Sequence, residues 1–348
     1  MRWYPVPVVR CGFCQNGAQP NDAGPSAMTF LRKSPPESQP TLSPITPGDL
    51  PPLGALRHLQ QEFDEANATF WGFIRAEARP CFTHGLLGDI ATMGMTLRRL
   101  HAQRKAAGQT PPRYFVGGSR APGIFNLGGD LALFLESIRA QNHSTLRAYA
   151  YQCIDAVYGF YIAFDLPIIG ISLVQGDALG GGFEAAMAAD IIVAERRARF
   201  GLPEVLFNLF PGMGAFSLLS RRLDASRAKQ MILSGRIYSA EEMAALGIVD
   251  VIAEDGFGEE AVRDYIARDT RRFGAHYAVC QAQRRVNPLD LAELRDITDL
   301  WVDAAMALCE DDLRRMQRLL TAQSRRQKGF AVEMPAETPR PGSLVAAE

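Results

Sequence analysis

Apolar and polar residues alternate in blocks along the middle of the chain. Residues 56–64 and 68–76 both place apolar residues at strand-like spacing, and a short polar turn at 65–67 separates them. This pattern predicts an antiparallel hairpin. Residues 85–106 then carry apolar positions at mostly helical spacing, which predicts a helix.

From residue 114 onward, strand-like segments alternate with helix-like segments. The elements predicted in chain order are a strand at 114–116, a glycine-rich loop at 117–129, helices at 131–139 and 145–164, a strand at 168–174, an Ala-rich helix after a run of glycines, and a strand at 191–194. Such alternation favours parallel βαβ units with helices covering the sheet. The chain is therefore predicted to have an α/β fold.

Loops and helices dominate the second half of the chain. The elements predicted there are loops at 199–205 and 210–214, a helix from about Ala215, an apolar run at 248–252 and a helical region at 258–328. Ser239 and Glu242 have the spacing of a helix capping box, and Gly247 marks the end of that helix.

Both ends of the chain differ in composition from its middle. Residues 1–54 are rich in Pro, Gly, Ser, Asn and Gln without a sustained period, and residues 329–348 are similar. Both are predicted to be disordered tails. Met28 lies inside the first tail as an alternative start. A core at 55–257 and a helical region at 258–328 remain between the tails.

Composition and charge exclude several classes of protein. The chain has 348 residues, of which 47% are hydrophobic, so it can bury a sizeable core. Its 37 basic and 38 acidic residues give a net charge of -1, which favours neither nucleic acid nor a membrane surface as a partner. No apolar run reaches the roughly 18 to 20 residues that span a bilayer. We expect a cytoplasmic protein that binds neither.

The six cysteines do not form a disulfide pattern. They are Cys11, Cys14, Cys81, Cys153, Cys280 and Cys309, and most stand alone in apolar surroundings. We expect reduced, buried thiols. Cys11 and Cys14 have the spacing of half a zinc site, but no second Cys or His pair accompanies them, so we expect no metal.

The most informative stretch is Gly180-Gly181-Gly182, which follows the apolar run at 168–174 and precedes Phe183-Glu184. Glycines at the start of a helix let backbone N–H groups approach a ligand closely, because no Cβ intervenes and first-turn amides lack partners within the helix. An acid just inside that helix, Glu184, can reach the same ligand.

A second acid with apolar neighbours is Glu204, within Leu202-Pro203-Glu204-Val205. Burial raises the pKa of a carboxyl group, which suits it to acid–base catalysis near neutral pH. The alternative is structural: Glu184 caps a helix, and Glu204 is an exposed loop residue.

A second amide comes from the segment Asn126-Leu127-Gly128-Gly129-Asp130, where a loop enters a helix just after a strand. The N–H of Gly129 can pair with that of Gly181 to form an oxyanion hole. The alternative is that the glycines only fit a tight turn and that Asp130 caps the helix. Both descriptions can hold together.

These motifs, taken in order, resemble a known family. NLGGDL, VQGDALGGGFEAA, GLPEVLF and LFPGMGA resemble the crotonase (enoyl-CoA hydratase/isomerase) superfamily over about residues 56–328. Together with the late segment TDLWVDAAMAL they are similar to the bacterial diffusible-signal-factor synthases, which make cis-2-unsaturated fatty acids. The resemblance implies a ββα spiral core and a C-terminal helical region that shapes the substrate pocket and the oligomer, a homotrimer or hexamer.

The resemblance also implies roles for individual residues. Gly129 and Gly181 match the amide donors to a thioester carbonyl, and Glu184 and Glu204 match the catalytic acids. The implied reaction is dehydration of a 3-hydroxyacyl thioester, carried on acyl carrier protein or coenzyme A, followed by hydrolysis to a free acid used in quorum sensing. It needs no cofactor. Sequence alone does not decide which glutamate is the acid.

Three points stay open at this stage. The C-terminal region offers apolar residues for an acyl slot or for ordinary packing: Trp301, Met306, Leu308, Leu319 and Leu320, of which Trp301 and Leu319 are the candidates we retain. Two interpretations are open for a basic run near the end of the chain: it contacts an acidic carrier, or it is a solvated helix face. The run consists of Arg314, Arg315, Arg318, Arg325, Arg326 and Lys328. The alternative functions are an ordinary enoyl-CoA hydratase/isomerase and a non-catalytic partner of a sensor kinase receiver domain.

Overall fold

The computed structural model describes residues 56–332. The N-terminal tail predicted at 1–54 lies outside these residues, together with Met28 and the Cys11–Cys14 pair. The last helix continues to Val332, four residues beyond the predicted boundary at 328, and residues 333–348 lie outside the described part. Within the described residues, no helix is long and apolar enough to cross a membrane.

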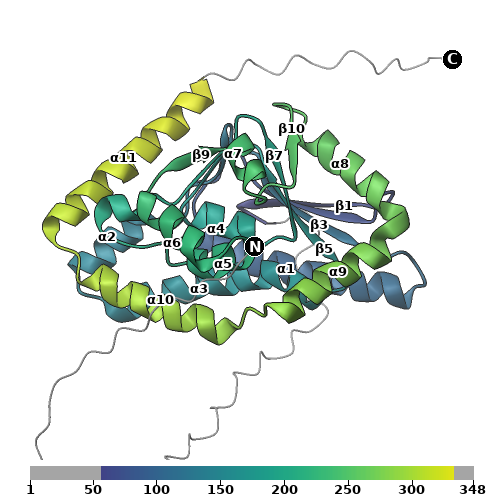
Figure 1. The fold of residues 1–348 in the computed structure, drawn as a ribbon, viewed down its shortest axis with the longest axis horizontal. Helices are drawn as coiled ribbons and strands as arrows, with labels where there is room; N and C mark the ends of the chain where they lie inside the picture. The colour runs from purple at the N-terminus through teal and green to yellow at the C-terminus, as the bar shows by residue number, and fades with distance from the viewer. Residues whose placement is uncertain (1–55, 333–348) are drawn as a thin grey trace, which may run out of the picture. The chain divides into compact units, whose positions relative to one another are not determined.

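A six-stranded sheet forms the centre of the fold, in the order β1-β2-β3-β5-β7-β10 (Figure 1). Its strands are β1 (Leu59–Asp64), β2 (Thr69–Ile74), β3 (Tyr114–Ser119), β5 (Ile169–Val174), β7 (Ile191–Glu195) and β10 (Val251–Ala253). Only β1 runs antiparallel to its neighbour, through the hairpin predicted at the N-terminal end of the core. The α/β prediction with parallel βαβ units is confirmed.

A smaller, four-stranded sheet was not predicted. Its strands are β4 (Ile124–Asn126), β6 (Asp177–Leu179), β8 (Arg199–Gly201) and β9 (Ile237–Ser239), in that order across the sheet. The loop predictions at 117–129 and 199–205 are therefore wrong in part, since β4 and β8 lie within them and β3 extends to Ser119. Strands of three residues are too short to show a period of two, and nearby Gly and Pro hide them.

Helices cover both faces of the larger sheet. The helices are α1 (His84–Ala106), α2 (Leu131–Arg139), α3 (His143–Tyr161), α4 (Gly181–Met187), α5 (Ala215–Arg222), α6 (Ala225–Ser234), α7 (Ala240–Ala245), α8 (Gly258–Asp269), α9 (Phe273–Val286), α10 (Leu291–Met306) and α11 (Glu310–Val332). Val262 and Ile266 of α8 pack on one face, and α1, α3 and α4 contribute to the core on the other. Along the edge of this arrangement, α10 runs beside α3 and α11 packs against α2 (Figure 1).

Several local predictions are confirmed by cap geometry. The Asp130 side chain accepts the N–H of Ala132 and caps α2, and Ser239 with Glu242 forms the capping box of α7. The helix predicted to end at residue 164 instead ends at Tyr161. Residues 163–165 have φ between 51° and 60°, because the chain must turn into the extended conformation that precedes Pro167.

The expectation of buried cysteines holds for three of the four described ones. Cys81, Cys153 and Cys280 are free and buried, whereas Cys309 is exposed. Cys309 precedes α11, where its thiol lies 3.1 Å from the Asp312 carboxylate. This polar contact at a helix start explains why it is not drawn into the core.

The short helix α4 is placed by close backbone contact. A Cβ on Gly182 would lie 2.0 Å from the carbonyl oxygen of Asn126, so only glycine allows α4 to approach β4 this closely. All seven residues of α4 are buried.

We expect Gly182→Ala to destabilise the protein by about 1 to 3 kcal/mol, because backbone atoms cannot yield to the added methyl group. The matched control is Gly88→Ala on the exposed face of α1, where a Cβ meets nothing within 4 Å. That change should stabilise the protein by up to about 1 kcal/mol through helix propensity. Urea unfolding checks both, and equal effects of the two changes would contradict the close contact.

Candidate active site

A cavity with an empty volume of about 670 Å³ opens at the N-terminal end of α4. All six residues singled out from the sequence line it: Gly129, Gly181, Glu184, Glu204, Trp301 and Leu319. They come from five separate segments of the chain, so the fold brings together residues up to 190 positions apart, the separation of Gly129 and Leu319.

Glu184 is held by two backbone amides. Its side chain is only 1% exposed, and Oε1 accepts the N–H of Met213 at 2.7 Å and that of Ala215 at 2.8 Å. Burial raises the pKa of Glu184 well above its ordinary value, the nearby charge of Glu204 raises it further, and the two amides oppose the rise. Glu184 is therefore not a helix-capping acid, because its carboxyl group binds a loop distant in sequence.

Glu204 has a different environment. It is the second residue of the 3₁₀ helix Pro203–Phe207 and is half-buried rather than lying in an exposed loop. Its Oε2 is buried without a hydrogen-bond partner among the described residues. Its Oε1 lies so near Gly180 that a Cβ there would come within 2.5 Å, and Gly180 also has a left-handed φ of 54°. Burial raises the pKa of Glu204 from 4.5 to about 7.

The charge on one carboxyl group affects the ionisation of the other. Both are taken out of water in one cavity, and the charge of Glu204 disfavours ionisation of Glu184. Two like charges in a shared buried site cannot both form readily, so the pair holds one proton over part of the neutral range. The raised pKa values favour one carboxylic acid beside one carboxylate in this site.

Two free amides face the same cavity. Gly129 and Gly181 both line it, and within residues 56–332 neither N–H has a hydrogen-bond acceptor. The segments that carry them touch, because a Cβ on Gly128 would lie 2.8 Å from the Gly181 nitrogen. Asn126 fixes the turn, since its Oδ1 accepts the N–H of Gly128 at 2.7 Å. Two unused amides beside two buried acids can bind an oxyanion.

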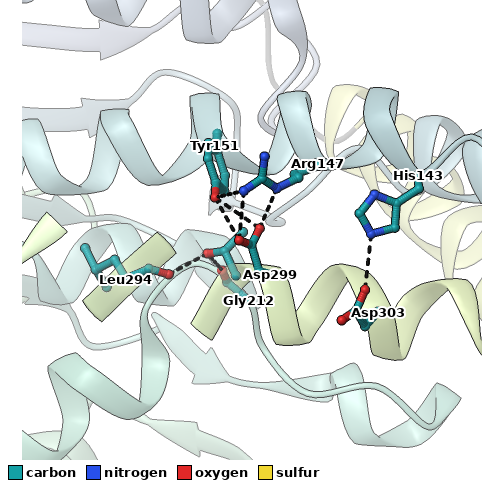
Figure 2. Close-up of polar contacts among 8 residues, drawn as sticks. His143, Arg147, Tyr151, Gly212, Leu294, Asp299 and Asp303 are labelled. Atoms are coloured by element: carbon teal, nitrogen blue, oxygen red, sulfur yellow. Dashed lines mark hydrogen bonds and ion pairs between the residues drawn. The ribbon is translucent and has the colours of Figure 1, made fainter. Parts of the chain in front are cut away.

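One face of α10 holds the loop that supplies both amides to Glu184. Thr298 Oγ1 donates to the carbonyl of Gly212 at 3.2 Å and to that of Leu294 at 2.8 Å (Figure 2). Trp301 packs over Gly212 so closely that a Cβ would lie 2.5 Å from the indole, and Leu294 packs on Gly214 in the same way, at 2.9 Å. Thr298 was not predicted as a site residue, because its partner Gly212 is 86 residues away in the sequence.

Helix α10 is in turn fixed to α3 by charged side chains. The Arg147 guanidinium donates two hydrogen bonds to Asp299, at 2.7 and 2.8 Å, and the Tyr151 hydroxyl donates to the same carboxylate (Figure 2). His143 contacts Asp303 at 3.1 Å one turn further along. These exposed pairs contribute little energy singly. Their role is to set the position of α10 along α3.

The segment that carries Gly129 is also held by α3. The buried hydroxyl of Tyr149 donates to the carbonyl of Phe82 and accepts the N–H of Asp130 at 2.9 Å. Arg79 binds both carboxylate oxygens of Asp130 at 3.0 Å. One helix, α3, therefore positions the Gly129 segment directly and the Glu184 loop through α10.

The cavity walls are mostly apolar. Trp301 and Leu319 line the cavity, whereas Met306, Leu308 and Leu320 pack against the core beside it. Lining residues that the sequence did not indicate include Phe134, Tyr149, Cys153, Phe207, Leu209 and Gln323. Helix α11 closes this side, where Gln323 Nε2 lies 3.4 Å from the carbonyl of Leu127.

The basic run on α11 lies away from these walls. Arg314, Arg315, Arg318 and Arg325 are exposed, and the first two pair with Asp311 and Asp312 one turn earlier. The side chains of Arg326 and Lys328 lie outside the described part of the chain. A solvated helix face is the description that these contacts support.

Comparison with known proteins finds similarity to one family. A family model described as enoyl-CoA hydratase/isomerase matches residues 116–283. The chain is 34% identical over 173 residues to the probable enoyl-CoA hydratase EchA17 of Mycobacterium tuberculosis, covering 49% of this chain and 61% of that protein. It is 31% identical over 209 residues to the mitochondrial methylglutaconyl-CoA hydratase of Mus musculus, covering 60% and 61%. Each match spans less than two thirds of the relative's own length.

A solved structure shows the same fold. Enoyl-CoA hydratase from Bacillus halodurans superposes with a TM-score of 0.58 at 21% identity, over 75% of this chain and 100% of that one. The crotonase-like α/β core with a helical C-terminal region is confirmed.

The buried acid pair should make stability depend on pH. Because the folded-state pKa of Glu204 is raised to about 7, this group destabilises the fold above pH 7, and the destabilisation disappears as the pH falls toward its ordinary pKa of 4.5. Relative to Glu204→Gln, the wild type should gain roughly 1 kcal/mol or more between about pH 8 and about pH 5. Urea unfolding of both proteins at several pH values measures this difference. A constant difference would contradict the raised pKa.

Proposed function

We propose that this chain, whose family-model match and fold support the crotonase (enoyl-CoA hydratase/isomerase) superfamily, interconverts 3-hydroxyacyl and 2-enoyl thioesters. The observation that carries the proposal is a pair of glutamates that share a cavity with two amides unpaired within residues 56–332. Glu184 is buried, and Glu204 is half-buried with its Oε2 out of contact with water. Adding or removing water across the bond next to a thioester needs both an acid and a base, and this pair supplies them near neutral pH.

The amides supply the other half of the chemistry. Loss of the α-proton of a thioester places negative charge on its carbonyl oxygen. The N–H groups of Gly129 and Gly181 would donate to that oxygen inside a mostly apolar cavity, where each such donor lowers the barrier by roughly 3 to 4 kcal/mol. The carboxylate of the pair takes the α-proton, and the carboxylic acid donates a proton to the departing 3-hydroxyl, which leaves as water.

After one dehydration the proton balance is restored within the pair. The acid has become a carboxylate and the base has become an acid, so their total charge is unchanged. The contacts do not assign the general acid and the general base to particular residues. Glu184 accepts hydrogen bonds from two amides, and Glu204 has an oxygen without a partner among the described residues. The acyl chain would lie against Trp301 and Leu319.

We further propose that the substrate is carried on acyl carrier protein and that the product is hydrolysed to a free cis-2-unsaturated fatty acid signal. The support for this finer assignment is the sequence resemblance to signal synthases, including the Trp301 segment. After dehydration, the carboxylate of the pair can deprotonate a water molecule that attacks the thioester carbonyl held by the two amides. The thiol carrier then leaves, and the fatty acid is released. The expected cytoplasmic location and the trimer or hexamer belong to the same proposal.

Glu184→Gln and Glu204→Gln should each lower the rate of 3-hydroxyacyl thioester dehydration roughly 100-fold or more, since an amide cannot exchange the proton. The control is Glu136→Gln, an exposed acid on α2, which should leave the rate unchanged. Mass spectrometry of the enoyl thioester measures turnover, and circular dichroism checks folding. Full turnover by a folded double variant would contradict the assignment of these two glutamates as the catalytic acids. Continued signal output in cells from a folded double variant without turnover would instead support a role as a non-catalytic partner.

The second step is tested by the form of the product. Purified full-length chain given 3-hydroxyacyl carrier protein should release free 2-unsaturated acid, and gas chromatography distinguishes the cis from the trans isomer. Supplying the same acyl group on coenzyme A shows which carrier is preferred. Efficient hydration of enoyl-CoA without any free acid would instead establish an ordinary hydratase.

A further inference from the structure

A second apolar cavity lies beside α4, and neither glutamate of the acid pair lines it. It has an empty volume of about 600 Å³ and is bounded by β2, β3 and β5 of the larger sheet and by residues of α1, α3 and α4. Glu184 lines the first cavity, and its neighbour Ala185 lines the second. The proposed reaction makes no use of this space.

The floor of the second cavity is a row of small residues. Gly72, Gly117 and Ser172 are register partners on three adjacent strands, so they stand side by side across the sheet. All three face the cavity. Neighbouring strands are about 4.8 Å apart, so the row forms a trough about 10 Å long that runs across the strands. Large β-branched or aromatic residues usually fill such buried positions and pack against the helices above.

The Gly72 end of this trough is filled, whereas Gly117 in its middle and the nearby Gly170 of β5 are less crowded. Met93 of α1 reaches down to Gly72, where a Cβ would lie 2.5 Å from its sulfur. At Gly117 a Cβ would meet only the ring of Phe115, at 3.5 Å, and at Gly170 it would come no closer than 3.7 Å to any atom. Gly117 is also partly accessible, although its strand neighbours Val116 and Gly118 are buried. An added methyl group would therefore fit at either glycine without a clash, and both glycines line the cavity.

A single unsatisfied donor lines this cavity. Asn126 is 1% exposed, and its Nδ2 has no hydrogen-bond partner within residues 56–332, whereas its Oδ1 accepts the N–H of Gly128. A buried amide donor without an acceptor is unfavourable by about 1 to 3 kcal/mol. An oxygen atom from a ligand in the cavity would satisfy it.

We propose that this cavity binds a linear aliphatic molecule that ends in an uncharged oxygen, such as a fatty alcohol or a protonated fatty acid. The chain lies in the cavity beside Gly117 and Gly170, and the oxygen accepts the hydrogen bond of Asn126 Nδ2. An ionised head group is excluded, because one neutral donor does not compensate for burying a charge. This site is separate from the proposed catalytic cavity and does not depend on the proposed reaction.

The test is calorimetric titration of the purified full-length chain with decanol, with decane as the probe that lacks an oxygen. We expect decanol to bind at least about fivefold more tightly than decane, which is the effect of one hydrogen bond of about 1 kcal/mol. Gly117→Val should weaken decanol binding at least about tenfold, because the added carbons occupy the trough. Gly88→Ala, on the exposed face of α1, should leave it unchanged.

Two further measurements distinguish this cavity from the first one and from misfolding. Ala150→Leu fills part of the catalytic cavity and should not alter decanol binding. Gly117→Val should keep or raise the melting temperature, since it fills empty space; if it unfolds the protein, the smaller Gly170→Ala takes its place with the same expectation. No binding by the wild type, equal affinity for decane, or loss of binding in Ala150→Leu alone would each overturn the proposal.

Discussion

The constraint on which the site depends is the burial of two carboxyl groups in one cavity. Glu184 and Glu204 cannot both ionise readily there, because removal from water and mutual repulsion disfavour two negative charges. Such a pair holds one proton, so acid and base coexist without an external partner. The amides of Gly129 and Gly181, unpaired within residues 56–332, add two donors that can bind an oxyanion in the same cavity.

The surrounding structure fixes the positions of the two carboxyl groups and the two amides. Glycines allow the close approach of backbones at β4 and α4, and α10 fixes the loop that binds Glu184. Because Thr298, Trp301 and Leu294 contact that loop from one helix face, a small movement of α10 would move the buried carboxyl as well. The ion pairs between α3 and α10 lie on the surface and join α3 to the helix that contacts this loop (Figure 2).

The sequence predicted the features that depend on neighbouring residues. The strand, glycine turn and helix around Gly181 and Glu184 follow from a local pattern, as do the Asp130 cap and the Ser239 capping box. It did not predict that the amides of Met213 and Ala215 donate hydrogen bonds to Glu184, or that α10 packs on the loop that carries these amides. These contacts join segments that are tens of residues apart. The strands β6 and β8 were missed for another reason: each is held by pairing within a small sheet and has no period of its own.

The most direct measurement of the central idea is an NMR titration of the chain carrying ¹³C-labelled glutamate carboxyl groups, with Glu184→Gln and Glu204→Gln used to assign the two signals. Our account predicts that the pair loses its protons in two steps and that Glu204 titrates near pH 7 in a folded protein. If both carboxyl groups titrated together near their ordinary value of 4.5, the pair would carry no proton at neutral pH, and the account would be wrong.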